Sequence, residues 1–299
     1  MSARKRKKTI RGFHVRRSGK KKLIVAAAAL AALGLVVFLA VWKERPQRGR
    51  AHPPAVRKEA AVYTAEPAER APAALPSKKP LRIAIVIDDF GYNDNNADEF
   101  LSIGQPLTFS ILPNLPYTNT IARKARLRGA EVILHLPLES VNQNAGMEKD
   151  TITTAMTDDE IRRILANAVE SVPGLVGVSN HMGSKATADG RVMDVIMGAL
   201  KKKGLFYLDS RSTGSSVCAR AARGAGCRFA ARDVFLDNEN DPEYIKGEIE
   251  KLEKKAEQNG YAIAICHDRR TTAAVMKEML PRLAARGFKF VYVSDLVER

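Results

Sequence analysis

Hydrophobic runs alternate with amphipathic, charged stretches along most of the chain after residue 80. The first of these runs, residues 83–87, contains only Ile, Ala and Val without polar alternation, a pattern typical of a parallel strand covered on both faces. The full pattern predicts strands near 82–88, 107–112, 130–135, 175–179, 205–209, 228–235, 261–266 and 288–293. It predicts helices near 94–103, 117–128, 158–171, 190–203, 213–223, 242–258 and 272–286.

Cap residues support these boundaries. Four basic helical runs each end in one glycine followed by an apolar strand, at Gly129, Gly204, Gly260 and Gly287. Glycine is common just past a helix end, and Lys or Arg in the last turn complements the helix dipole. Thr157 and Glu160 have the spacing of a capping box, and Asp241 before Pro242 predicts another helix start.

The strict strand–helix alternation predicts an α/β fold with a parallel sheet and right-handed crossovers. Such a sheet can close into a barrel or remain open and doubly wound. The sequence contains neither the glycine fingerprint of a dinucleotide-binding fold nor a P-loop. We therefore expect residues 81–299 to form an irregular (β/α) barrel of seven or eight parallel strands.

Residues 23–42 form a different kind of hydrophobic run, because they contain no charge and have the length of a transmembrane helix. Residues 1–22 carry eleven Lys or Arg and no acid, which places them in the cytoplasm by the positive-inside rule. The run is long for a cleaved signal peptide, no small-x-small site follows it, and a buried core helix fits these flanks poorly. We expect a single-pass signal anchor in the inner (cytoplasmic) membrane, with the C-terminal domain facing the periplasm or the cell exterior.

Residues 43–80 hold seven of the fourteen prolines and predict a disordered, Pro/Ala-rich tether. The net charge of +16 lies entirely within residues 1–80, because residues 81–299 contain equal numbers of basic and acidic side chains. The basic character therefore belongs to the N-terminal tail and tether. This location excludes nucleic acid as the main partner of the folded domain.

Polar side chains stand where the predicted strands end. The carboxyl ends of parallel strands meet at one mouth, where ligands bind. One Asp can simply cap a turn, and a lone His is often structural, but an Asp pair with three His favours a metal or hydrolytic site. The residues at these ends are Asp88-Asp89, Asn114, His135, Asn180-His181, Asp209-Ser210 and His267-Asp268.

This set of side chains has the groups needed for hydrolysis. Two imidazoles and one carboxylate suit Zn²⁺ or a similar divalent ion, which lowers the pKa of bound water and polarises a carbonyl. A second carboxylate can accept a proton from that water, and a free imidazole can protonate the leaving group. The sequence therefore predicts metal-assisted hydrolysis of an amide or ester.

Several of these strand ends carry motifs, which are DDFG at 88–91, EVILH at 131–135, NHMGS at 180–184, DS at 209–210 and CH at 266–267. Together they resemble the divergent polysaccharide deacetylase family, a distant relative of the NodB-type carbohydrate esterases. The resemblance covers residues 81–299 and implies a deformed (β/α) barrel that removes acetyl groups from a cell-envelope glycan. A catalytically weak barrel that binds metal and a glycan or an envelope protein is the alternative.

The resemblance also implies catalytic roles. Asp88 matches the catalytic base and His267 matches the general acid. The arginine that orients the base in the wider superfamily has no counterpart in the motifs, and Arg211 and Arg270 are candidates for its place.

The resemblance implies metal ligands as well. Asp89 matches the metal-binding aspartate, and His135 matches the first histidine of a His-x-x-x-His motif. The second histidine of that motif is Glu139 here, so the third ligand is either Glu139 or, as we expect, His181. We expect substrate contacts from the other polar residues of the mouth, namely Asn114, Asn180, Ser184, Asp209 and Arg211.

The cysteines leave one question open. Cys218 and Cys227 lie outside the membrane in the expected topology, where an oxidising compartment permits a disulfide, although two free thiols are equally consistent with the sequence. Cys266 precedes His267 in a strand and is expected to be a small buried hydrophobic residue. The long polar stretch 142–154 could either contact substrate or be disordered.

Overall fold

The structure is a computed structural model that describes residues 80–142 and 146–298. All of these residues belong to the second of two compact units, Ala74–Arg299. The expected cytoplasmic tail (1–22), membrane anchor (23–42) and nearly all of the tether (43–80) lie outside the described residues. Within the described part of the chain, no helix combines the length and the apolar character that a membrane span requires.

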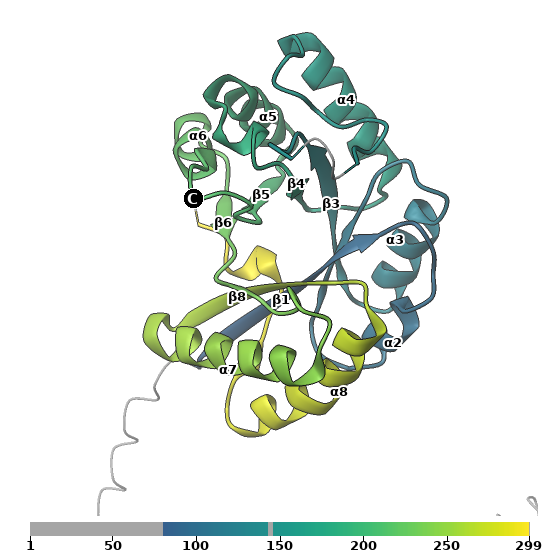
Figure 1. The fold of residues 1–299 in the computed structure, drawn as a ribbon, viewed down its shortest axis with the longest axis vertical. Coiled ribbons are helices and arrows are strands. Elements are labelled where there is room, and N and C mark those ends of the chain that lie inside the picture. The colour runs from purple at the N-terminus through teal and green to yellow at the C-terminus, as the bar shows by residue number, and fades with distance from the viewer. Residues whose placement is uncertain (1–79, 143–145, 299) are drawn as a thin grey trace, which may run out of the picture. The chain divides into compact units, whose positions relative to one another are not determined.

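The sheet is parallel and curled. Its strand order is β6-β5-β4-β3-β2-β1-β8-β7. The short strand β9 is not part of this order and pairs with β1. Figure 1 shows the sheet curving around the centre of the domain. The strands are β1 (Arg82–Phe90), β2 (Thr108–Ile111), β3 (Glu131–Leu138), β4 (Gly177–Met182), β5 (Phe206–Asp209), β6 (Phe229–Ala231), β7 (Val234–Phe235), β8 (Tyr261–His267) and β9 (Lys289–Phe290).

The helices lie on the outside of the curled sheet (Figure 1). The predicted caps are confirmed: Thr157 and Glu160 form a capping box, and the Asp241 side chain accepts a hydrogen bond from the Tyr244 amide at 2.8 Å. The helices are α2 (Ala97–Leu101), α3 (Thr118–Leu127), α4 (Asp158–Ser171), α5 (Gly190–Lys203), α6 (Cys218–Ala225), α7 (Pro242–Asn259) and α8 (Arg270–Ala285).

A single stretch of chain joins the two edges of the sheet. β6 pairs with β5 at one edge and β7 pairs with β8 at the other, and Arg232 and Asp233 separate the two strands. The Arg232 amide donates to the Asp209 carbonyl at 3.0 Å, while the Asp233 amide donates to the Ile263 carbonyl at 2.8 Å. The predicted strand 228–235 is therefore two short strands, and the fold fits an irregular (β/α) barrel rather than an open doubly wound sheet.

Two apolar clusters explain why the strands lack polar alternation. Alternate residues of β1, such as Ile83 and Ile85, pack against the helices in the larger cluster. Their neighbours Ala84 and Val86 face the inside of the curled sheet, where they join a smaller cluster of strand residues and the C-terminal segment. Val293 belongs to this inner cluster and donates its amide to Thr108, near the amino ends of the strands. The C-terminal segment thus fills the base of the barrel.

Two predicted elements differ from the structure. The helix expected at 213–223 begins at Cys218 and ends at Ala225. The strand expected at 288–293 contains Lys289 and Phe290 alone and is followed by a 3₁₀ turn, because the chain turns there into the base of the barrel.

The three cysteines are free thiols. Cys218, Cys227 and Cys266 are all buried in the larger apolar cluster, and the disulfide considered for the first two is not formed. Burial raises the pKa of the Cys218 thiol to about 12. These side chains therefore act as small hydrophobic residues, as expected for Cys266.

Candidate active site

The inner face of the sheet changes from apolar to polar toward the carboxyl ends of the strands. Strand side chains on one face recur every second residue, so Asp88 follows Ala84 and Val86, and His135 follows Ile133. The same spacing places four more polar side chains near the strand ends on the inner face, namely Ser110, Ser179, His181 and His267. A polar layer therefore covers the apolar interior of the barrel.

The two aspartates of β1 both line one cavity, although neighbouring strand residues normally point to opposite faces. The pairing of β1 with β2 shifts register between Ile87 and Phe90, and Asp89 has a left-handed backbone with φ of 70°. This local irregularity turns the Asp89 carboxylate toward the side of the sheet that Asp88 already faces.

Asp89, His135 and His181 each offer a ligand atom, and these atoms lie within 4.8 Å of one another. Asp89 Oδ1 is 3.0 Å from His181 Nδ1 and 3.3 Å from His135 Nε2. Burial alone would raise the pKa of Asp89, but hydrogen bonds from the two imidazoles outweigh it and hold the pKa well below its usual range. The predicted ligand set is thus assembled, and its two nitrogens and one oxygen suit a divalent cation.

A pair of serines orients the deepest of these ligands. His135 is 3% exposed, and its Nδ1 lies 2.8 Å from the Ser179 hydroxyl. Ser179 in turn lies 2.8 Å from the Ser110 hydroxyl. Because Nδ1 is engaged in this way, Nε2 is the ring nitrogen that faces Asp89.

Asp88 lies beside the ligand group and is almost completely buried. Its Oδ1 is 3.5 Å from His135 Nδ1 and has no hydrogen-bond partner among the described residues. Burial raises the pKa of Asp88, and the charge of His135 offsets this effect in part. A buried carboxylate oxygen without a hydrogen-bond partner destabilises the fold. This cost indicates that the oxygen accepts a proton or contacts a ligand in the cavity.

His267 lies on the other side of Asp89, with its Nε2 3.9 Å from Asp89 Oδ2. Its Nδ1 is 2.9 Å from Oδ1 of Asp237, which is fully buried. Burial lowers the pKa of His267, but the hydrogen bond to Asp237 outweighs that effect and raises the pKa overall. The hydrogen bond to Asp237 therefore makes protonation of His267 easier than for a free imidazole.

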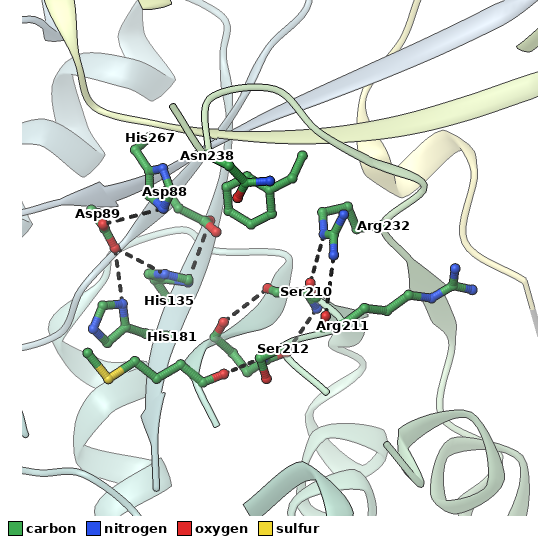
Figure 2. Close-up of a pocket in the computed structure, with 13 residues that line it drawn as sticks. Asp88, Asp89, His135, His181, Ser210, Arg211, Ser212, Arg232, Asn238 and His267 are labelled. Atoms are coloured by element: carbon green, nitrogen blue, oxygen red, sulfur yellow. Dashed lines mark hydrogen bonds and ion pairs between the residues drawn. The ribbon is translucent and has the colours of Figure 1, made fainter. Parts of the chain in front are cut away.

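These groups surround a cavity of about 500 Å³. Figure 2 shows His267, Asp89 and His181 on one side of it and Arg211 and Arg232 on the other. The lining residues are Asp88, Asp89, His135, Asn180, His181, Met182, Ser210, Arg211, Ser212, Arg232, Phe235, Asn238 and His267.

The residues expected to contact substrate fall into two groups. Asn180 and Arg211 line the cavity. The side-chain oxygen Oδ1 of Asn180 also accepts a hydrogen bond from the backbone amide of Ser210 at 2.9 Å, which ties the end of β4 to the segment after β5. Asp209 does not line the cavity, and it supports the same segment by accepting the Arg211 amide at 2.8 Å.

Asn114 and Ser184 lie outside the cavity. The Asn114 side chain donates to Asp150 at 3.1 Å, and the Ser184 hydroxyl accepts the Val141 amide at 3.0 Å. Both residues therefore contact the long connection between β3 and α4. Their role in the structure is to hold that connection rather than to line the mouth.

Two alternatives for the site are resolved by contacts elsewhere. Glu139 accepts the Thr154 amide and the Lys185 ammonium, each at 2.7 Å, and it is not part of the ligand group. Arg270 has a side chain that is 85% exposed and lies 3.8 Å from Glu99. His181, and not Glu139, therefore lies with Asp89 and His135 in the group that could hold a metal ion, and Arg270 does not reach Asp88.

Asp237 and Arg232 belong to the site but were not predicted from the sequence, and the same holds for Ser110 and Ser179. Asp237 lies two residues after the end of the predicted strand 228–235. The rule that polar residues at strand ends form the site could therefore have included it. Arg232 lies inside that predicted strand, and nothing in the sequence indicates the break that exposes it to the cavity.

Two uncharacterised proteins are each similar to this chain over 202 residues. The uncharacterised protein YibQ of Escherichia coli K12 is 38% identical over 202 residues, which cover 68% of this chain and 63% of that protein. An uncharacterised protein of Haemophilus influenzae is 33% identical over 202 residues, which cover 68% of this chain and 72% of that protein. The matched region thus spans less than two thirds of the length of the E. coli relative.

A solved structure confirms the fold, and a family model identifies the family. The crystal structure of an uncharacterised protein from Agrobacterium tumefaciens C58 superposes with a TM-score of 0.71 at 24% identity, covering 75% of this chain and 92% of that one. The model of the divergent polysaccharide deacetylase family matches residues 85–297. The match includes the aspartate pair, the ligand group and His267. The chain belongs to the divergent polysaccharide deacetylase family.

Proposed function

We propose that this protein is a metal-dependent hydrolase that removes acetyl groups from a polysaccharide of the cell envelope. The observation that carries the proposal is the meeting of a ligand group, a buried carboxylate and an oriented imidazole around one cavity. Membership of the divergent polysaccharide deacetylase family supports an acetylated glycan as the substrate class. The buried Oδ1 of Asp88 and the imidazole of His267 held by Asp237 support hydrolysis rather than binding alone.

Asp89, His135 and His181 would hold the divalent cation, for which Zn²⁺ is our candidate. Asp89 Oδ1 already receives hydrogen bonds from both imidazoles, and a cation can replace the protons that these rings now donate. When bound, such an ion polarises the scissile carbonyl and lowers the pKa of water.

Asp88 and His267 are placed to move the two protons of the reaction. The unpartnered Oδ1 of Asp88 can accept the proton that the attacking water loses. Asp237 holds Nδ1 of His267, so Nε2 is the nitrogen that can protonate the sugar amine or hydroxyl as acetate leaves. The raised pKa of His267 favours the protonated form that this step requires.

We also propose that residues 23–42 anchor the domain in the inner membrane and place it on the periplasmic or outer side. This proposal is supported by the uncharged length of the segment and the positive residues before it. A fully extended tether over residues 43–80 would reach at most roughly 130 Å. The domain would then act on envelope polysaccharide close to the membrane.

The test uses the purified full-length chain, its metal content by elemental analysis and acetate release from acetylated chitooligosaccharides and peptidoglycan fragments. Asp88→Asn should lower acetate release by about 10²-fold or more, because it removes the proton acceptor, and should leave the metal content unchanged. Asp159→Asn is the matched control, because the Asp159 side chain is 94% exposed on α4 and lies outside the cavity. Its acetate release should equal that of the wild type.

Two results would count against the hydrolase. Metal-loaded wild type that releases no acetate from either substrate would favour the alternative, a barrel that binds glycan or an envelope protein. Equal acetate release by the wild type and Asp88→Asn would remove Asp88 from the chemistry.

A further inference from the structure

Two arginines form the wall of the cavity opposite the ligand group. Figure 2 shows Arg211 and Arg232 across the cavity from Asp89 and His181. Arg232 is half-buried and fixed in place: its Nε donates to the Ser210 carbonyl at 2.8 Å and its Nη2 to the Arg211 carbonyl at 3.3 Å. Its guanidinium also lies 4.9 Å from the ring centroid of Phe235. The exposed Arg211 side chain borders the same space.

In the described part of the chain, neither of these two charges has a carboxylate in direct contact. Within residues 80–142 and 146–298, neither guanidinium has an acidic oxygen within 4.0 Å, and the nearby Asp209 is occupied by the Arg211 amide and the Ser216 hydroxyl. Burial lowers the pKa of Arg232 and the positive charge of Arg211 lowers it further, while the more distant charges of Asp209, Asp233 and Asp88 offset part of this effect. Two like charges on one partly buried wall are costly unless an anion lies between or beside them.

We infer that Arg211 and Arg232 bind an anionic substituent of the glycan, a carboxylate or a phosphate, carried close to its acetylated position. The inference rests on the proposed function and names the substrate class of the same cavity. A guanidinium presents several fixed N–H donors that match the oxygens of either anion. Among the described residues, no hydrogen bond engages Nη1 of Arg232 or the Arg211 guanidinium, so both can make this contact.

The distribution of charged side chains around the cavity also determines how a bound substrate is oriented. The two arginines attract an anion at one side of the cavity, whereas Asp88 and Asp89 line the other side. An anionic sugar would therefore place its negative group at the arginines and present its acetyl group to the ligand group. A neutral sugar would lack this preference and would bind more weakly.

Three sugars that share an acetamido group test the inference by binding. They are N-acetylglucosamine, which is neutral, N-acetylmuramic acid, which carries a carboxylate, and N-acetylglucosamine 6-phosphate. Calorimetry on the purified full-length chain should show at least one anionic sugar binding about tenfold tighter than the neutral one. The difference should shrink in high salt, and the tighter of the two anionic sugars identifies the anion.

Single substitutions locate the contact. Arg211→Asn suits the backbone of that position, where φ is 50°, because Asn tolerates left-handed conformations. Arg211→Asn and Arg232→Gln should each lower the preference for the anionic sugar severalfold. Arg270→Gln is the control, because it removes a surface arginine outside the cavity and should keep the full preference.

The inference is overturned if the wild type binds none of the anionic sugars, if it binds all three equally, or if both arginine variants retain the preference. These outcomes are independent of turnover. Anion preference without acetate release would refute the hydrolase and support the arginine site. Acetate release without anion preference would do the reverse.

Discussion

Asp237 fixes the imidazole that we assign as the proton donor. It is fully buried and accepts three hydrogen bonds, from the His267 amide and Nδ1, each at 2.9 Å, and from the Thr272 hydroxyl at 2.8 Å. A buried carboxylate with this many donors stays ionised, and the pKa of Asp237 is lowered despite burial. Its negative charge therefore favours the protonated form of His267.

Asp237→Asn should move the pH profile of acetate release. Asp237 raises the pKa of His267, so the neutral amide lets that pKa fall. A proton donor works below its pKa and fails as pH rises through it, so the alkaline limb of the variant should shift to lower pH. Thr272→Val removes one hydrogen bond to Asp237 without changing charge and should leave the limb in place. An unmoved limb in Asp237→Asn would exclude His267 as the donor.

Ser179→Ala should weaken metal binding by about 10- to 100-fold, because the hydroxyl that orients His135 through Nδ1 is lost. Competition with a chromogenic chelator measures the affinity. The exposed Ser215 is not a lining residue, and Ser215→Ala should bind metal as the wild type does. Unchanged affinity in Ser179→Ala would show that Ser179 does not position His135.

At the scale of elements, the turn after β1 joins the end of that strand to the segment after β2. Gly91 has φ of 133°, its carbonyl accepts the Tyr117 amide at 3.0 Å, and the Phe90 carbonyl accepts the Leu112 amide at 2.8 Å. The segments after β1 and β2 are thereby locked together. A side chain at Gly91 would lie 3.3 Å from the Leu112 carbonyl, where there is little space.

Gly91→Ala should destabilise the protein by about 1–3 kcal/mol, because it adds backbone strain and crowding at once. Denaturant unfolding measures the change. Gly198→Ala is a control for which the opposite change in stability is expected. A methyl group added at Gly198 in α5 would meet no atom within 4 Å, so alanine there should stabilise the helix by about 0.5–1 kcal/mol. Equal unfolding midpoints for Gly91→Ala and the wild type would contradict this account of the turn.

At the scale of the whole molecule, metal binding should stabilise the fold, because the ligands come from β1, β3 and β4 and meet only when the sheet is formed. Zn²⁺ at 100 times its Kd should add about 2.7 kcal/mol to the free energy of unfolding. Thermal unfolding after chelation and after reloading measures this change. His181→Ala should lose the response, whereas Asp159→Asn should keep it. If the melting temperature of the wild type is the same after chelation and after reloading, the result would argue against a metal site.

The proposed anchor has a separate test. The full-length chain should remain in the membrane pellet after an alkaline carbonate wash, because a twenty-residue apolar helix inserts stably. A chain lacking residues 23–42 should move to the soluble fraction. Release of the full-length chain by the wash would contradict the anchor.

Much of the site follows from residues next to predicted strand ends. Asp88, His135 and His267 could be assigned because parallel strands end at one mouth. The rule failed for Asn114 and Ser184, which stand near strand ends but point to the connection after β3. Sequence position gives the end of a strand and not the direction of a side chain beyond it.

The sequence by itself determined the order of strands and helices, the helix caps, and the family, since hydrophobic period, cap residues and motifs are local properties. Only the tertiary structure decided that His181 rather than Glu139 joins the ligand group, that Asp237 holds His267, and that Arg232 faces the cavity. Each of these depends on distances between segments far apart in the chain, and such distances are set by sheet register, by a bulge and by the joining of two sheet edges. No local pattern encodes them.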